Sequence, residues 1–222
     1  MKPELVIFHC DGVLVDTEPV ANAVMAELLS AEGLSLDAAG ATAQFVGKSM
    51  RPVKIEVEAE LGRALTDDWL EGVWAATLKR FGETAVDPIP GVNDVIAVID
   101  RAEIPIRVAS SGSIAKMKTT LSATGLYPRL KDVLFTADDV EHGKPAPDLF
   151  LHAARAMPVS PGSCAVIEDS RFGVEAAVSA GMRALGYTAA PHSDPAVFLE
   201  LCAENFNDMA LPPSLLELEV GP

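Results

Sequence analysis

Residues 5–18, LVIFHCDGVLVDTE, carry the strongest fold signal in the chain. The run from Leu5 to Phe8 is apolar and short, which is typical of one strand buried on both faces of a parallel sheet. It ends abruptly in a polar cluster, His9 to Asp11, followed by Gly12. Because open α/β sheets bind ligands outside the carboxyl ends of their strands, this pattern predicts a central strand that delivers side chains to a site.

The composition is that of a globular protein. Of the 222 residues, 49% are hydrophobic and 22% charged, which separates the chain from disordered sequences and allows one domain or two.

No apolar run approaches the roughly 20 residues of a membrane-spanning helix, and no signal peptide is recognisable, so a cytoplasmic protein with no membrane partner is expected. The formal net charge of -15 argues against a nucleic-acid partner. The oligomeric state is left open.

The three cysteines are odd in number and lack the spacing of a metal site; they are Cys10, Cys164 and Cys202. Cys10 and Cys164 fall in or beside expected buried strands, so both are interpreted as reduced core residues. A reactive Cys10 is the less favoured alternative.

Two different sequence patterns divide the chain into segments. Residues 17–87 are helical in pattern throughout, and Trp69 and Trp74 fall at spacings typical of a helix-bundle core. A proline-rich linker at 88–91 follows, after which short strands alternate with helices. Such alternation predicts a parallel sheet covered on both faces. We therefore expect an α/β core of residues 1–16 and 88–222, with residues 17–87 inserted as a helical cap domain.

Polar clusters follow four strand-like runs or the loops after them. Each cluster alone is weak, since Ser-Ser-Gly is commonly an ordinary loop and a single lysine is commonly a solvated surface charge. Their shared position at the ends of expected buried strands is informative, because polar groups there need partners. The clusters are His9 with Asp11, Ser110 with Ser111, Lys144, and Glu168 with Asp169.

Taken in order, these motifs resemble those of the haloacid dehalogenase superfamily, in its phosphatase branch with a helical cap. The similarity extends over nearly the whole chain and is greatest to the group of phosphoglycolate phosphatase and beta-phosphoglucomutase. The family has Asp-x-Asp-Gly where this chain has His9-Cys10-Asp11-Gly12. The later motifs match at residues 108–111 (VASS), 143–148 (GKPAPD) and 167–170 (IEDS). The resemblance implies a Rossmann-like core and Mg²⁺-dependent hydrolysis of a small phosphorylated metabolite.

The resemblance also implies a role for each motif. The residue at position 9 is the nucleophile, which in the family is an aspartate that becomes an aspartyl-phosphate. Asp11 is the general acid and base, and its backbone carbonyl is a metal ligand. Lys144 offsets charge between phosphate and carboxylates. Asp169 ligates Mg²⁺, and Glu168 does so directly or through water.

The same resemblance places the phosphate oxygens at Ser110, with Ser111 and Gly112 in the substrate loop. In the inserted helical segment, Gly47 belongs to a loop expected to face the substrate, although a plain turn is an equal alternative.

Two neighbouring activities of the family are disfavoured. The 2-haloacid dehalogenases lack the second catalytic aspartate, which is present here as Asp11. Phosphomutases of this group carry a histidine near the position of Ala21 and an arginine near the position of Met50, although Arg51 is adjacent.

His9 is the departure from the pattern. An imidazole offers no second carboxylate oxygen, and its nitrogen is a poor ligand for Mg²⁺ compared with Zn²⁺ or Ni²⁺. Loss of a covalent nucleophile costs on the order of 10⁴- to 10⁶-fold in rate, so little or no turnover by the family route is expected.

Three explanations of His9 compete. It is a substitution, natural or introduced, in an ordinary phosphatase frame; or it marks a pseudoenzyme that binds phosphorylated metabolites without turnover. The least favoured alternative is a phosphohistidine intermediate, or a transition metal held by His9 and Asp169.

Overall fold

The computed structural model describes residues 2–45, 50–190, 192–201 and 203–218. The chain divides into two compact units, Met1–Asp16 with Asp87–Pro222, and Thr17–Val86. Among the described residues, no helix combines the length and the apolar character that a membrane crossing needs.

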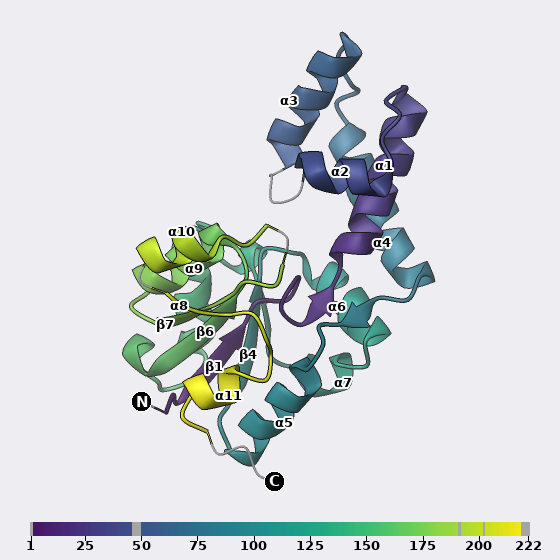
Figure 1. Ribbon diagram of the computed structural model, residues 1–222. Helices are drawn as coiled ribbons and strands as arrows, with labels where there is room; N and C mark the ends of the chain where they lie inside the picture. The colour runs from purple at the N-terminus through teal and green to yellow at the C-terminus, as the bar shows by residue number, and fades with distance from the viewer. Residues whose placement is uncertain (1, 46–49, 191, 202, 219–222) are drawn as a thin grey trace. The chain divides into compact units, whose positions relative to one another are not determined.

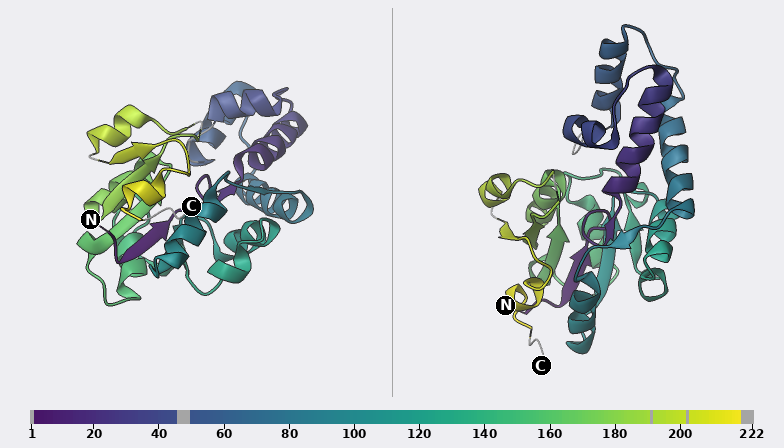
Figure 2. Two further views of the ribbon diagram at one scale, coloured as in Figure 1. Left: turned by 60° about the horizontal axis from the view of Figure 1, so that its bottom comes forward. Right: turned by 45° about the vertical axis from the view of Figure 1, so that its right-hand side comes forward.

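The first unit is built on a six-stranded parallel sheet, which confirms the predicted α/β, Rossmann-like class. The strands are ordered β5-β4-β1-β6-β7-β8. Their bounds are β1 Leu5–Phe8, β4 Ile106–Ser110, β5 Leu134–Thr136, β6 Cys164–Glu168, β7 Arg183–Tyr187 and β8 Glu204–Phe206. Both views in Figure 2 show the purple β1 between the teal elements on one side and the green strands on the other. The next sheet strand, β4, pairs on one side of β1 and the later β6 on the other, so the strand order reverses at β1, which is where such sheets bind ligands.

Helices cover both faces of this sheet. Figure 1 shows α8 and α9 on one side and α5 and α6 on the other. The helices of this unit are α5 Val92–Arg101, α6 Ile114–Ala123, α7 Tyr127–Leu130, α8 Asp148–Arg155, α9 Arg171–Ser179, α10 Pro195–Glu200 and α11 Pro212–Leu215, with 3-10 turns η1 Ala137–Asp139 and η2 Pro161–Ser163.

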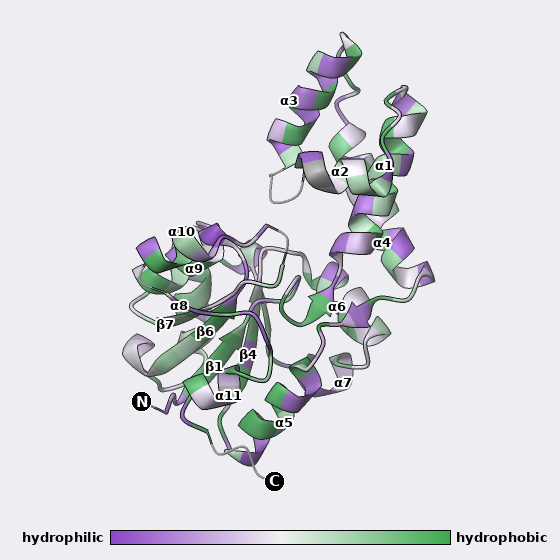
Figure 3. Cartoon of the chain, viewed as in Figure 1, coloured by the Kyte–Doolittle hydropathy of each residue, from purple (hydrophilic) through white to green (hydrophobic). Residues whose placement is uncertain are grey.

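The apolar run of β1 is explained by these two layers. Leu5 and Ile7 pack into the core cluster of α8 and α9, and all four residues of the strand are fully buried. Since neither face meets water, the strand shows no polar alternation. Figure 3 accordingly shows β1 in green, whereas α5 carries both colours. The buried residues of α5 recur at helical spacing, which is typical of a helix with one face on a sheet.

The described residues of the second unit form four helices, α1 Glu18–Glu32, α2 Ala38–Phe45, α3 Met50–Leu61 and α4 Trp69–Glu83. Helix α1 ends at Gly33, whose φ of 102° suits glycine. The helices share a core that includes Leu29, Phe45, Val57 and Trp69. The expected core position of Trp74 is wrong: its side chain is 56% exposed, because it lies on the outer side of α4, whereas Trp69 is buried.

A short pair of strands was not predicted. Val15–Asp16 (β2) and Asp87–Pro88 (β3) pair in antiparallel fashion, with Val15 opposite Pro88 and Asp16 opposite Asp87. The sequence suggested only a linker at 88–91, because a two-residue strand is too short to show periodicity.

Candidate active site

The parallel sheet brings three strand ends together. Phe8 of β1 is in register with Val108 of β4 and with Ile167 of β6, so the residues that follow the strands emerge at one edge. The backbone N–H of His9 extends the ladder by donating to the carbonyl oxygen of Ile167 at 2.9 Å. The polar clusters predicted from sequence therefore share one edge of the sheet.

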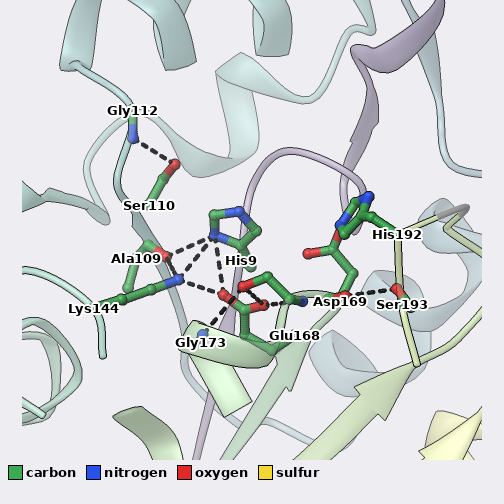
Figure 4. Close-up of polar contacts among 11 residues, drawn as sticks. His9, Ala109, Ser110, Gly112, Lys144, Glu168, Asp169, Gly173, His192 and Ser193 are labelled. Atoms are coloured by element: carbon green, nitrogen blue, oxygen red, sulfur yellow. Dashed lines mark hydrogen bonds and ion pairs between the residues drawn. The ribbon is translucent and has the colours of Figure 1, made fainter. Parts of the chain in front are cut away.

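His9 lies at the centre of the cluster (Figure 4). Its Nδ1 atom is 3.0 Å from Nζ of Lys144, 3.2 Å from the carbonyl oxygen of Ala109 and 3.6 Å from Oε1 of Glu168. Nδ1 of His9 therefore contacts Lys144, as one oxygen of a carboxylate at this position could also do. Unlike a carboxylate, the imidazole has no second oxygen next to this atom that could bind another partner.

Lys144 and Glu168 form a buried ion pair beside His9. Nζ of Lys144 is 2.5 Å from Oε1 of Glu168, and the two side chains are 4% and 0% exposed. Lys144 also donates to the carbonyl oxygen of Ala109 at 3.2 Å and lies 4.6 Å from the centre of the Phe150 ring. The second oxygen of Glu168 accepts from the backbone N–H and hydroxyl of Ser170 at 2.7 and 2.9 Å.

This environment keeps Glu168 ionised. Burial alone raises the pKa of the Glu168 carboxyl, but His9 and Lys144 lower it to about 2. The carboxylate fits only because residue 173 is a glycine: a Cβ atom on Gly173 would lie 1.9 Å from Oε1 of Glu168. The close approach of helix α9 to Glu168 thus depends on the absence of a side chain at Gly173.

Asp169 is buried next to this pair. Its Oδ2 atom is 3.0 Å from Nε2 of His192, and its carbonyl oxygen accepts from the Ser193 hydroxyl at 2.6 Å. Among the described residues, no hydrogen-bond donor reaches its buried Oδ1 atom. Burial raises the pKa of this carboxyl. Glycine is required at position 12 for two reasons. A Cβ atom there would lie 2.0 Å from Oδ2 of Asp169, and the φ of +76° is a left-handed conformation that favours glycine.

Asp11 lies at the more open side of the site. Its Oδ1 atom is 2.9 Å from Nζ of Lys116, and each side chain is 22% exposed. The preceding residue anchors the turn, because the carbonyl oxygen of Cys10 accepts from the N–H groups of Leu14 and Val15. This turn fixes the backbone on either side of Asp11.

The loop after β4 adjoins Asp11. The Ser110 hydroxyl is buried and accepts from the N–H of Gly112 at 3.0 Å, and a Cβ atom on Gly112 would lie 3.6 Å from Oδ2 of Asp11. Ser111 is exposed. Ser113 caps α6 by accepting from the N–H of Lys116. The loop therefore leads into a helix N-terminus, where backbone N–H groups favour anions.

Of the site residues predicted from sequence, all but one fall within this cluster and its adjoining loop. Gly47 lies outside the described residues. Cys10 and Cys164 are free and buried, as expected for core residues. Burial also raises the pKa of the Cys10 thiol well above its usual value.

Two residues of the site, Lys116 and His192, were missed. Lys116 lies on the first turn of α6, three residues after its N-cap, so its place beside Asp11 follows from the capped turn. His192 lies in a loop after β7 with no motif around it, and nothing in the sequence indicated its contact with Asp169.

The side chains of His9, Glu168 and Asp169 could hold a metal ion. One ligand atom from each lies within 4.8 Å of the others. The buried Oδ1 of Asp169, which no donor reaches, is suited to a cation. The set as a whole does not fit Mg²⁺, because one of the three donors is an imidazole and Mg²⁺ prefers oxygen in a near-ideal octahedron.

Comparisons with known proteins agree with this geometry. Residues 3–181 match the model of the haloacid dehalogenase-like hydrolases. The chain is 30% identical over 194 residues to the 6-phosphogluconate phosphatase of Escherichia coli, covering 87% of this chain and 86% of that protein. It is 34% identical over 183 residues to the fructose-1-phosphate phosphatase YqaB of Escherichia coli, covering 81% and 93%. A crystal structure of a haloacid dehalogenase-like protein from Agrobacterium tumefaciens superimposes with a TM-score of 0.82 at 31% identity, covering 96% and 97% of the two chains.

Proposed function

The chain belongs to the haloacid dehalogenase-like hydrolases, and on this basis we propose that its α/β unit is the frame of a Mg²⁺-dependent hydrolase of small phosphorylated metabolites. By family it is a phosphomonoester hydrolase, since the relatives are named as phosphatases of sugar phosphates and related acids. The helical unit is proposed as the cap, and Gly47 as part of its substrate loop.

The observation that carries the proposal is the arrangement of two lysines around the strand ends. Phosphoryl transfer is mainly positioning and neutralisation of a spread negative charge. Lys144 lies beside residue 9 and Lys116 beside Asp11, so two positive charges flank the point where a phosphoryl group would pass from substrate to residue 9. In a chain with a net charge of -15, such local positive charge is needed to hold a phosphate.

The residues take the following roles in the proposal. Ser110, Ser111 and Gly112 hold phosphate oxygens through hydroxyl and backbone N–H groups at the start of α6. Asp11 gives a proton to the leaving oxygen and then takes one from the attacking water. The contact with Lys116 orients the carboxyl group of Asp11.

His9 limits what the frame can do. An imidazole cannot form the aspartyl-phosphate, so we expect little or no turnover from the chain as written. The donor set with His9 does not suit Mg²⁺ either, so the Mg²⁺ dependence implied by the family is expected of the His9→Asp protein. In that protein, Asp169, Glu168 and the Asp11 carbonyl are the proposed ligands, and the ion would neutralise charge on the phosphoryl group.

A second function is favoured by one observation. Nδ1 of His9 already has a hydrogen-bond partner in Lys144 or Ala109, and the loop from Ser110 to Gly112 is formed without it. Such a site can bind a phosphorylated metabolite without turning it over. A non-catalytic binding protein is therefore the alternative.

The test is turnover of phosphomonoesters, including 6-phosphogluconate and fructose 1-phosphate, by the chain and by His9→Asp with Mg²⁺. We expect the reverted protein to be faster by on the order of 10⁴- to 10⁶-fold. His9→Asn is the matched control, because asparagine has the shape of aspartate without the nucleophilic oxygen, and it should stay inactive.

Three outcomes separate the possibilities. Turnover only by His9→Asp supports the hydrolase frame. Comparable turnover by the chain with His9 contradicts the expected inactivity. If neither protein turns over a substrate while both bind phosphomonoesters, the binding function replaces the hydrolase.

A further inference from the structure

The three buried residues His9, Glu168 and Asp169 form a mixed nitrogen and oxygen donor set. Within the part of the chain that the structure describes, they are the one group of three whose ligand atoms lie close enough to share a metal ion. Glu168 is fully buried, Asp169 is 2% exposed and the His9 side chain is 12% exposed. Such a set is therefore shielded from water, unlike a cluster of surface carboxylates.

Asp169 gives an independent indication of a cation. Its Oδ1 atom is buried and no hydrogen-bond donor among the described residues reaches it. Figure 4 shows this oxygen directed toward His9, while the other oxygen meets His192. A buried carboxylate oxygen that lacks a donor is costly unless a cation takes that place.

The outer partners resemble those of a built metal site. Ligating carboxylates are commonly held by a hydrogen bond from a neighbouring residue, and Nε2 of His192 lies 3.0 Å from Oδ2 of Asp169. Ligating imidazoles commonly have their other contacts to backbone carbonyls or charged groups, and Nδ1 of His9 lies 3.2 Å from the carbonyl oxygen of Ala109.

We propose that His9, Glu168 and Asp169 bind a divalent transition cation of the Zn²⁺ class, in place of the Mg²⁺ that the family uses. An imidazole with two carboxylates suits such ions, whereas Mg²⁺ prefers oxygen ligands alone. The replacement of a carboxylate by His9 thus changes which metal the site selects.

The charged side chains favour a cation at this place. Two carboxyl groups, those of Glu168 and Asp169, lie in this cluster with one lysine, Lys144. Lys144 is the local competitor, because its Nζ atom contacts both His9 and Glu168. It retains the Ala109 carbonyl oxygen as a partner at 3.2 Å when an ion binds to Glu168.

The site is shared with the proposed hydrolase, but the inference is tested by binding alone, without substrate. Zn²⁺ and Mg²⁺ affinities are measured by calorimetry for the metal-free full chain, His9→Asn and His9→Asp. We expect Zn²⁺ affinity to fall in His9→Asn by at least the roughly 10- to 100-fold that outer partners contribute. We expect the preference for Zn²⁺ over Mg²⁺ to fall in His9→Asp, because an oxygen donor returns.

Two further variants locate the effect. His142→Gln is the matched control, because His142 also faces a carboxylate, with Nδ1 3.6 Å from Oδ1 of Asp148, yet its side chain is 65% exposed and is not one of the three donors. It should leave Zn²⁺ affinity unchanged. His192→Ala should weaken Zn²⁺ binding by roughly 10-fold, since it removes the partner of Asp169.

A measurement on the unmodified chain covers the case in which a variant fails to fold. Co²⁺ in a site with an imidazole ligand gives visible absorption, and Zn²⁺ should shift the ¹⁵N resonances of the His9 ring. Unchanged His9 resonances at saturating Zn²⁺, or a Zn²⁺ affinity in folded His9→Asn equal to that of the chain, would overturn the proposal. Failure of this kind leaves the hydrolase frame untouched, because the frame is tested by turnover of His9→Asp.

Discussion

The site contains two lysine–carboxylate pairs that differ in burial. Lys144 and Glu168 are 4% and 0% exposed, whereas Lys116 and Asp11 are each 22% exposed. A buried pair is costly to break, because the remaining charge has no water, whereas a part-exposed pair can exchange partners. The buried pair therefore forms the fixed frame of the site, and the open pair contains Asp11, the residue that we propose as general acid and base.

The largest effect on stability is expected from Lys144→Met. It leaves the carboxylate of Glu168 buried without its lysine, which should lower the free energy of unfolding by about 3–5 kcal/mol. Urea unfolding followed by circular dichroism measures the change. The double variant Lys144→Met/Glu168→Gln is the control, because it removes both charges and should recover much of the loss. No recovery would mean that packing, not charge, explains the single variant.

A smaller effect is expected from Gly173→Ala, which adds a Cβ atom 1.9 Å from Oε1 of Glu168. Overpacking of this kind costs roughly 1–3 kcal/mol. The matched variant is Gly112→Ala beside the open pair, where the nearest atoms, at 3.3 Å, are side-chain atoms of Lys116 and Ser110. We expect thermal unfolding to show a clear loss for Gly173→Ala and little for Gly112→Ala. Equal losses would remove the distinction between the two sides.

Lys116→Met should change stability by less than about 1 kcal/mol, because its pair with Asp11 is partly exposed. In the His9→Asp protein it should nevertheless lower kcat, because Asp11 loses the partner that directs its carboxyl group. Lys118→Met is the control, since Lys118 is exposed on the same helix. An equal loss of kcat in both variants would show that general charge, not the contact with Asp11, is responsible.

The smallest change is expected at Cys10, next to His9. Burial raises the pKa of its thiol well above the ordinary 9.0, so the thiolate stays scarce in the folded protein even when pH rises past the pKa of an unfolded thiol. Alkylation at pH 8 to 9, followed by peptide mapping, should leave Cys10 unmodified in the native chain and modified in urea. Rapid native modification would restore the reactive alternative.

The strands of the parallel sheet and the polar residues at their carboxyl ends were predictable from sequence. An apolar run that ends in a polar cluster, such as Leu5 to Asp11, shows both the strand and its exit, because local order determines both. The contact of His192 with Asp169 was not predictable, since it depends on where separate loops meet, whereas Lys116 could have been placed from the capped first turn of α6. Trp74 was misplaced for a related reason: helical spacing alone does not show which of two nearby aromatic residues faces the core.

The buried frame, if intact, should support covalent chemistry as soon as residue 9 is a carboxylate. The direct measurement is acid quenching of His9→Asp and of the unmodified chain during reaction with a phosphomonoester and Mg²⁺, followed by mass spectrometry of the peptide that contains residue 9. We predict a phosphoryl adduct on that peptide in His9→Asp and none in the chain with His9. A folded His9→Asp protein that turns over substrate without an adduct on this peptide, or with one elsewhere, would contradict the account.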